Sequence, residues 1–170
     1  MKDSSTIQSY LTNSNVHFQA QSNLTFTSGN PPSGPTLSLD PSTKYQTIKG
    51  YGAALTDSSA FLISEMPEDQ QNELLHDLFD PQQGIGINFL RLPISACDFS
   101  LENYTYDSMP EGHTDPLLSN FSIKHDQNYT IPLLKKIKSI NPKLKIMMTQ
   151  WSPPAWMKNT DSLLGSVDSQ

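Results

Sequence analysis

The sequence predicts an α/β fold with parallel strands, and this prediction depends on three observations. Mostly apolar runs of strand length lie at residues 46–55, 87–94 and 144–148. Two stretches with the apolar spacing of helices, 60–79 and 126–140, alternate with these runs. Strands that alternate with helices are typical of βα units, in which each helix crosses back over a parallel sheet. A length of 170 residues fits either one ordinary domain or a piece of a larger one.

The first 44 residues are polar and rich in turn-forming residues, which predicts a different kind of structure. Segments 16–20 and 24–27 alternate apolar and polar residues, and this favours short strands with one side in water. The Gly- and Pro-rich cluster at 29–35 indicates a loop, and 36–39 is predicted to be another short strand. We expect this segment to be antiparallel β structure without a core of its own.

Two helices are expected after the first strand of the α/β part. Residues 56–59 (TDSS) are typical of a helix N-cap, and Asp57 within them is interpreted as a cap rather than a catalytic residue. A second helix is predicted from Met66, with Pro67 in its first turn and acidic residues where the helix dipole is positive. Residues 80–81 (DP) end it.

The apolar run at 87–94 predicts a strand buried on both faces. It contains the only arginine of the sequence, Arg91, which is interpreted as a structural ion-pair partner. The polar stretch from 95 to 125 follows, and a loop of this length in a compact domain is usually functional or disordered. The helix at 126–140 and a second buried strand at 144–148 complete the pattern.

Charge and motif content exclude several classes of function. The chain has 11 basic and 17 acidic residues, so it is a poor candidate for binding nucleic acid by neutralising phosphates. Its four histidines form neither an HxH nor an HExxH pair, which argues against a metal site. Glycine-rich phosphate or dinucleotide motifs are missing, so no cofactor is expected. The single cysteine, Cys97, has no disulfide partner within the chain and is interpreted as a small buried thiol.

Two predicted strand ends carry residue types that suit carbohydrate binding. Ligands of parallel α/β folds bind beyond the carboxyl ends of the strands, where Asp98, Phe99 and Trp151 stand in this sequence. A carboxylate accepts hydrogen bonds from sugar hydroxyls, and an indole ring stacks on the apolar face of a pyranose. Asp98 also fits a local capping role in its loop, and Trp151 also fits packing at the rim of the core, so both readings stay open.

Four blocks follow one another along the chain: 50–60 (GYGAALTDSSA), 84–94 (GIGINFLRLPI), 95–107 (SACDFSLENYTYD) and 151–158 (WSPPAWMK). In residue types, order and approximate spacing they resemble the blocks of glycoside hydrolase family 30, which contains glucosylceramidases (acid β-glucosidases) and β-1,6-glucanases. One departure concerns residues 149–150, where Thr-Gln stands in place of the Ser-Pro that often precedes the tryptophan in the family.

The resemblance implies a (β/α)₈ TIM barrel, of which residues 45–170 would form the N-terminal part, about three βα units. Residues 1–44 would contribute strands to an accessory β domain. The resemblance assigns sugar binding to Asp98 and Trp151, with Phe99 beside them. Retaining glycosidases use two carboxylates about 5–5.5 Å apart. The family's acid/base glutamate lies in an Asn-Glu-Pro context that none of the five glutamates here shares, so both catalytic glutamates are expected beyond Gln170.

The implied function of the intact protein is that of a retaining O-glycoside hydrolase, most simply a glucosylceramidase. Activity as a β-1,6-glucanase or β-xylosidase is the alternative within the family. The alternative outside enzymes is an inert truncated chain or a sugar-binding remnant, and the 170 residues alone are expected to be inactive. Expected partners are a β-glucoside or glucosylceramide, a lipid surface contacted peripherally and the remainder of the chain's own barrel.

The expected location depends on two observations that point in different directions. No signal peptide is visible at the start of the sequence. Four glycosylation sequons nevertheless favour a secreted or lysosomal protein, and they begin at Asn23, Asn103, Asn120 and Asn128.

Overall fold

A computed structural model describes residues 6–26, 28–29 and 33–165 of the chain. Its contacts divide the chain into two units, Met1–Gln46 and Thr47–Gln170, which are described separately. The first unit contains two short antiparallel pairs. In one, β1 (Thr6–Ile7) pairs with β4 (Leu24–Thr25), and in the other, β2 (Tyr10–Leu11) pairs with β3 (Gln19–Ala20).

The strands of the first unit are shorter than the sequence predicts. Phe18 has a positive φ of 47°, which a strand does not accommodate, so β3 begins only at the next residue. Its ring instead stacks on Tyr10, with the ring centroids 4.6 Å apart. The strand predicted at 36–39 is wrong, because these residues have no regular structure and no strand partner.

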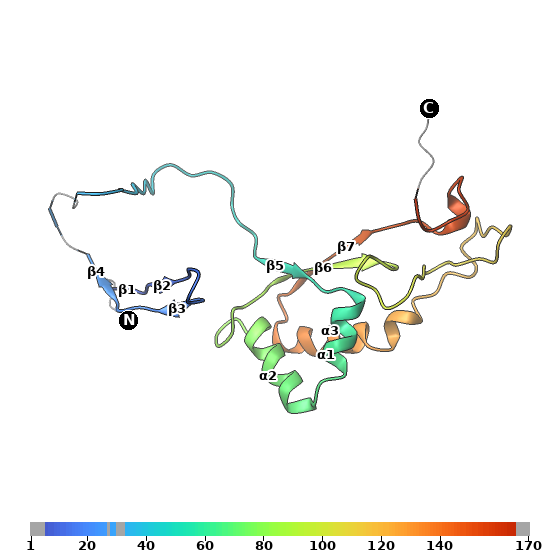
Figure 1. The fold of residues 1–170 in the computed structure, drawn as a ribbon, viewed down its shortest axis with the longest axis horizontal. Helices are drawn as coiled ribbons and strands as arrows, with labels where there is room; N and C mark the ends of the chain where they lie inside the picture. Colours follow the sequence, from blue (N-terminus) through green and yellow to red (C-terminus); the bar gives the residue numbers. More distant parts are fainter. Residues whose placement is uncertain (1–5, 27, 30–32, 166–170) are drawn as a thin grey trace. The chain divides into compact units, whose positions relative to one another are not determined.

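The second unit is built on a three-stranded parallel sheet in the order β5–β6–β7 (Figure 1). Its strands are β5 (Gly52–Ala54), β6 (Phe89–Ile94) and β7 (Lys145–Gln150). Gly52 is needed where β5 meets β6, since a Cβ atom there would lie 2.0 Å from the carbonyl oxygen of Phe89. The alternation of strands and helices predicted from the sequence is therefore confirmed.

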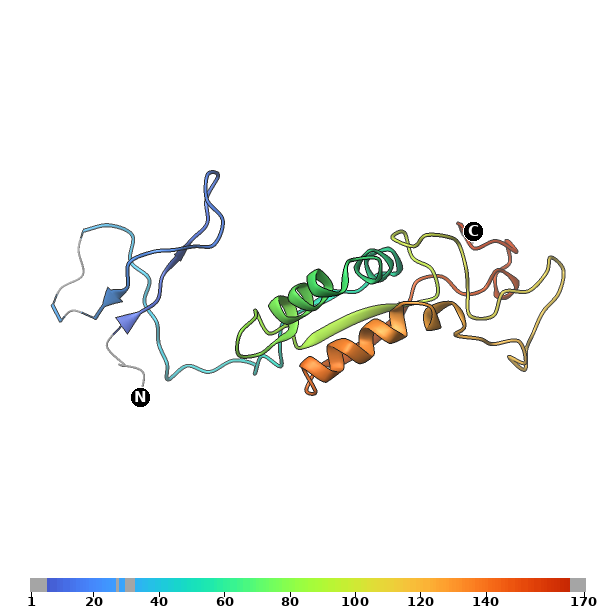
Figure 2. The same ribbon diagram turned by 90° about the horizontal axis from the view of Figure 1, so that it is seen from below.

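The helices α1 (Asp57–Ser64), α2 (Glu68–Phe79) and α3 (Thr130–Ile140) all lie below the sheet in Figure 1, on one face of it. Figure 2 is seen from this helix-bearing side. Between the helices and the sheet lies a hydrophobic core, to which β6 contributes two leucines. The buried residues of this core are Leu55, Ala60, Leu75, Phe79, Leu90, Leu92, Leu133, Ile137 and Leu144.

The strand β7 differs from its prediction, because its apolar side chains are exposed. The exposed fractions are 43% for Ile146, 46% for Met147 and 48% for Met148. Among the residues that the structure describes, β7 is the outer strand of the sheet, with β6 as its one partner. The prediction of a buried strand is therefore wrong for this chain, since burial on both faces needs neighbours beyond β7.

Two helices also begin at residues other than those predicted, and residues of the site are involved in both cases. The helix α1 begins at Asp57, and Thr56 is its N-cap, with the Thr56 hydroxyl accepting from the Ser59 amide. The interpretation of Asp57 as the cap is therefore wrong. The helix α3 begins four residues later than predicted, because a 3₁₀ turn, His125–Gln127, precedes it.

Candidate functional site

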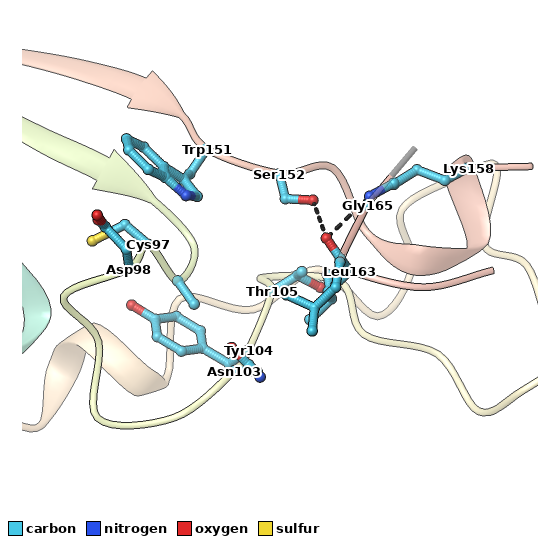
Figure 3. A pocket seen from close by; sticks show the side chains of 12 residues that line it. Cys97, Asp98, Asn103, Tyr104, Thr105, Trp151, Ser152, Lys158, Leu163 and Gly165 are labelled. Carbon is cyan, nitrogen blue, oxygen red and sulfur yellow. Dashed lines mark hydrogen bonds between the residues drawn. The ribbon is translucent and has the colours of Figure 1, made fainter. Parts of the chain in front are cut away.

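A cleft with a volume of about 390 Å³ lies at the carboxyl ends of β6 and β7 (Figure 3). The loop after β6 contributes residues 96–98 and 103–105 to its lining, and the segment after β7 contributes residues 151–152, 158 and 163–165. Parallel α/β folds bind their ligands in this position, because the loops that follow neighbouring strands meet there.

Asp98 lines the cleft, and its carboxylate projects from a tight turn. The Cys97 amide donates to the Ser100 hydroxyl at 3.0 Å, and the Phe99 amide donates to the Cys97 sulfur at 3.4 Å. The side chain of Asp98 itself is exposed and accepts no hydrogen bond from the part of the chain that the structure describes. The alternative that Asp98 caps its own loop is therefore not supported, and both carboxylate oxygens are open to a ligand.

Trp151 lines the same cleft from the end of β7 and is 51% exposed. The guanidinium carbon of Arg91 lies 5.5 Å from the centroid of the indole ring, within the range of a cation–π contact. Arg91 also donates from Nε to the Thr149 hydroxyl at 2.8 Å. Within the described part of the chain its partners are a ring and a hydroxyl, so the interpretation of Arg91 as one half of an ion pair is not supported there.

Two further residues of the loop after β6, Phe99 and Cys97, take different positions relative to the cleft. Phe99 is 64% exposed and does not line the cleft, although it follows Asp98 directly. Cys97 is half-buried and lines the cleft, so its interpretation as a buried thiol is wrong. The turn at 97–100 thus places Cys97 and Asp98 in the cleft lining and leaves Phe99 outside it.

Tyr104 is a cleft residue that the sequence analysis did not single out. Its ring stacks on His125 at a centroid distance of 3.7 Å, and its hydroxyl donates to Asp126 at 3.4 Å. Burial, together with the negative charges of Asp126 and Asp57, raises the pKa of Tyr104 well above its usual range, so the phenol stays protonated. The one feature of the sequence that could have indicated Tyr104 as a cleft residue is its position in the tyrosine-rich block at 95–107.

At the far end of the cleft, opposite Trp151 and Asp98, two side chains donate hydrogen bonds to one main-chain carbonyl (Figure 3). The carbonyl of Leu163 accepts from the Lys158 ammonium and from the Ser152 hydroxyl, each at 3.0 Å. These contacts fold residues 158–165 back over the end of the segment that follows β7. Trp156 packs outside the cleft, where its indole N–H donates to the Asp107 carbonyl at 3.0 Å.

The cleft presents hydrogen-bonding groups and an aromatic face, and Asp98 is the one carboxylate among its described lining residues. Within the described ranges, no three His, Cys, Asp or Glu side chains are grouped in a way that could hold a metal ion. Such a cleft can bind a ligand with neighbouring hydroxyls and an apolar face. The described residues of this cleft do not supply the second carboxylate that glycoside hydrolysis by the retaining mechanism needs.

Parallel βα units with a ligand cleft at their strand ends place this chain in the class of (β/α)-barrel proteins. A family model described as the glycosyl hydrolase family 30 TIM-barrel domain matches residues 48–168. The chain belongs to glycosyl hydrolase family 30. The expected fold class, the N-terminal part of a TIM barrel, is thereby confirmed.

Curated relatives include enzymes of two named activities. The chain is 35% identical to the lysosomal acid glucosylceramidase of Mus musculus over 134 residues, 78% of this chain and 25% of the relative. It is 37% identical to an endo-1,6-β-D-glucanase of Neurospora crassa over 144 residues, 82% of this chain and 30% of the relative. The chain thus spans roughly a quarter to a third of the length of these relatives.

Solved structures give the same result. An endo-β1,6-glucanase matches with a TM-score of 0.63 and 34% identity, over 71% of this chain and 25% of that one. SrfJ from Salmonella typhimurium matches with a TM-score of 0.62 and 32% identity, over 69% of this chain and 25% of that one. As to membranes, the helices of the described residues are too short or too polar to cross one.

Proposed function

We propose that this chain forms one wall of the sugar site in a retaining O-glycoside hydrolase. The observation that carries the proposal is the meeting of Asp98 and Trp151 in one cleft, although they come from different strands. Membership of a glycosyl hydrolase family supplies the reaction class. The sugar ring would stack on Trp151, and neighbouring hydroxyls would donate to the Asp98 carboxylate.

The role of these residues is to bind and orient the sugar. Hydrolysis with retention needs one carboxylic acid that protonates the leaving oxygen and one carboxylate that attacks the sugar, about 5–5.5 Å apart. The described lining of the cleft offers one carboxylate, that of Asp98, and sugar hydroxyls would bind to it. We therefore assign no catalytic residue to this chain and expect the chain alone to be inactive.

The favoured substrate is glucosylceramide or a related β-glucoside. The CDFS form of residues 97–100 and the identity with the glucosylceramidase of Mus musculus support this choice. Activity on β-1,6-glucan is the second candidate, supported by the 37% identity with the glucanase of Neurospora crassa. A β-xylosidase activity is the third candidate.

Two further parts of the proposal concern the setting of the enzyme. Residues 1–44 would contribute to an accessory β domain, which their antiparallel pairs support. A secreted or lysosomal location is supported by the four sequons and by the lysosomal relative, and a glucosylceramide substrate would bring the enzyme into peripheral contact with lipid.

The test is hydrolysis by the full-length protein that carries this sequence. Purified protein would be assayed on glucosylceramide, on a β-1,6-glucan and on an aryl β-xyloside, with the Asp98→Asn variant as control. We expect release of glucose from glucosylceramide with retained anomeric configuration, and a higher KM in the variant. Faster hydrolysis of the glucan or the xyloside would replace the favoured substrate, and inactivity on all three would refute the proposal.

A further inference from the structure

We propose that Asp57 is a positioning residue of the sugar site, which holds the turn that presents Asp98. This inference rests on the function proposed above for Asp98. Asp57 lies outside the lining of the cleft, so it acts through the turn rather than by touching the sugar.

The first turn of α1 holds the backbone that directly follows Asp98. The Ser58 amide donates to the Phe99 carbonyl at 3.0 Å, directly after Asp98. The Leu101 amide donates to Asp57 Oδ2 at 2.9 Å, two residues further on. Within the turn, the bond between the Cys97 amide and the Ser100 hydroxyl closes the loop around Asp98. A shift of α1 or loss of the Asp57 carboxylate would therefore release the backbone that carries Asp98.

The second oxygen of Asp57 binds the other end of the same long loop. Asp57 Oδ1 accepts from His125 Nε2 at 2.9 Å and from the Tyr129 hydroxyl. His125 in turn stacks on Tyr104, which lines the cleft beside Asp98. One carboxylate thus ties together the two ends of the loop between β6 and α3 and supports two side chains of the cleft wall.

Burial and charge make this arrangement sensitive to the chemistry of residue 57. Asp57 is only 3% exposed, so an unpaired charge there would be costly. Burial raises the pKa of Asp57, but hydrogen bonds from Tyr129, the Leu101 amide and His125 outweigh it, and the net pKa is lowered. The residue is therefore an ionised acceptor for three donors, a role that neither an amide nor an alanine can fill.

The test is a double-mutant cycle in the full-length enzyme, with Asp57→Asn, Asp98→Asn and the double variant. Asparagine keeps the size of the side chain but replaces one acceptor oxygen by a donor. We expect Asp57→Asn to raise KM about tenfold and to change kcat less than about threefold, since the lost contacts serve ground-state binding. In the Asp98→Asn background the same change should alter kcat/KM by less than about twofold.

The matched control is Gln71→Leu, a buried polar residue of the same unit that is away from the cleft. Its amide donates to the Ile63 carbonyl at 2.6 Å, and its oxygen accepts from Lys136. We expect this variant to lower the thermal midpoint without a change in KM. An equal loss of kcat/KM from Asp57→Asn with and without the Asp98 carboxylate would overturn the positioning role, as would an unchanged kcat/KM in the single variant.

Two further measurements keep the outcome decisive. If Asp57→Asn does not fold, Tyr129→Phe removes one of the three donors and should raise KM about threefold, again only when Asp98 is intact. The rate of amide hydrogen exchange at residues 97–104 measures how firmly the backbone of the turn is held, and it needs no substrate. Faster exchange there in Asp57→Asn, but not in Gln71→Leu, is expected, and unchanged exchange would overturn the inference. A wild-type enzyme that hydrolyses no glycoside would instead refute the proposed function.

Discussion

The guanidinium of Arg91 lies 5.5 Å from the centroid of the Trp151 ring. Arg91 stands in the middle of β6, and Trp151 follows the last residue of β7, so this contact joins the two strands whose ends carry the cleft. Arg91 Nε also donates to the Thr149 hydroxyl at 2.8 Å, which holds the guanidinium next to the ring. The only arginine of the chain therefore orients the aromatic wall of the site.

Replacement of Arg91 by lysine is expected to loosen Trp151. Lysine keeps the positive charge but has neither the planar group nor the Nε–H, so the stacking and the bond to Thr149 are both lost. We expect the free energy of unfolding to fall by about 1–2 kcal/mol and KM to rise. Urea unfolding and substrate kinetics of the full-length protein measure the two effects. Thr149→Val removes only the hydrogen bond and should show the smaller change, and equal effects of the two variants would contradict the stacking.

The two tryptophans of the chain are expected to respond differently to substitution. Trp151 lines the cleft, whereas Trp156 donates to the Asp107 carbonyl outside it. Trp151→Ala should raise KM about tenfold because the stacking face is lost, while Trp151→Phe should retain most of the affinity. Trp156→Phe should leave KM unchanged and lower the free energy of unfolding by about 1 kcal/mol. A larger rise in KM from Trp156→Phe than from Trp151→Ala would contradict the assignment of the sugar contact to Trp151.

The strands and helices with long apolar patterns could be predicted from the sequence. Where the start of a helix or the burial of a strand differs from the prediction, the difference has a physical cause. The helix α3 starts at Thr130 rather than at 126, because Asp126 accepts hydrogen bonds from Tyr104 and Tyr106 in the preceding 3₁₀ turn. The exposure of β7 is not predictable from its apolar composition, which suits a strand with more neighbours than the described residues supply.

The candidate site was predictable only where a general rule connects distant residues. Parallel strands bring their carboxyl ends together, so Asp98 and Trp151 could be expected in one place. No such rule connects Asp57 with its partners, because Leu101, His125 and Tyr129 follow it by 44, 68 and 72 residues. The local pattern at 56–59 correctly indicates an N-cap, which is Thr56, but it carries no sign of the tertiary contacts of Asp57.

The hydrogen bonds of Asp57 predict that part of the stability of the protein is lost in acid. The pKa of Asp57 in the folded protein is lowered from its usual 3.8, so its contribution is fully present above that value. This contribution disappears as the pH falls through the lowered pKa. Thermal unfolding of wild-type and Asp57→Asn protein between about pH 3 and pH 6 measures the difference. We expect the wild-type thermal midpoint to exceed that of the variant by a constant amount in the upper part of this range and by less below pH 3.8. A difference that grows toward acid would contradict an ionised Asp57.

A second buried aspartate, Asp107, is expected to show the opposite sign. It is 3% exposed, and neither carboxylate oxygen has a hydrogen-bond donor in the described structure. Burial and the charge of Asp115 raise the pKa of Asp107, while hydrogen bonds from Asn120 and Ser119 lower that of Asp115. Asp107 therefore stabilises the fold when protonated, and this contribution is lost as the pH rises from its usual value of 3.8 through the raised one.

The variant Asp107→Asn removes this penalty, because its neutral amide can donate to the ionised Asp115. We expect its thermal midpoint to exceed that of the wild type at neutral pH, with a difference that shrinks to nothing as the pH falls below 3.8. The control is Asp115→Asn, which removes the carboxylate that accepts from the Asn120 amide and should lower the midpoint at neutral pH. A destabilised Asp107→Asn variant at neutral pH would show that the Asp107 carboxylate is ionised and bound by a group that the described contacts do not include.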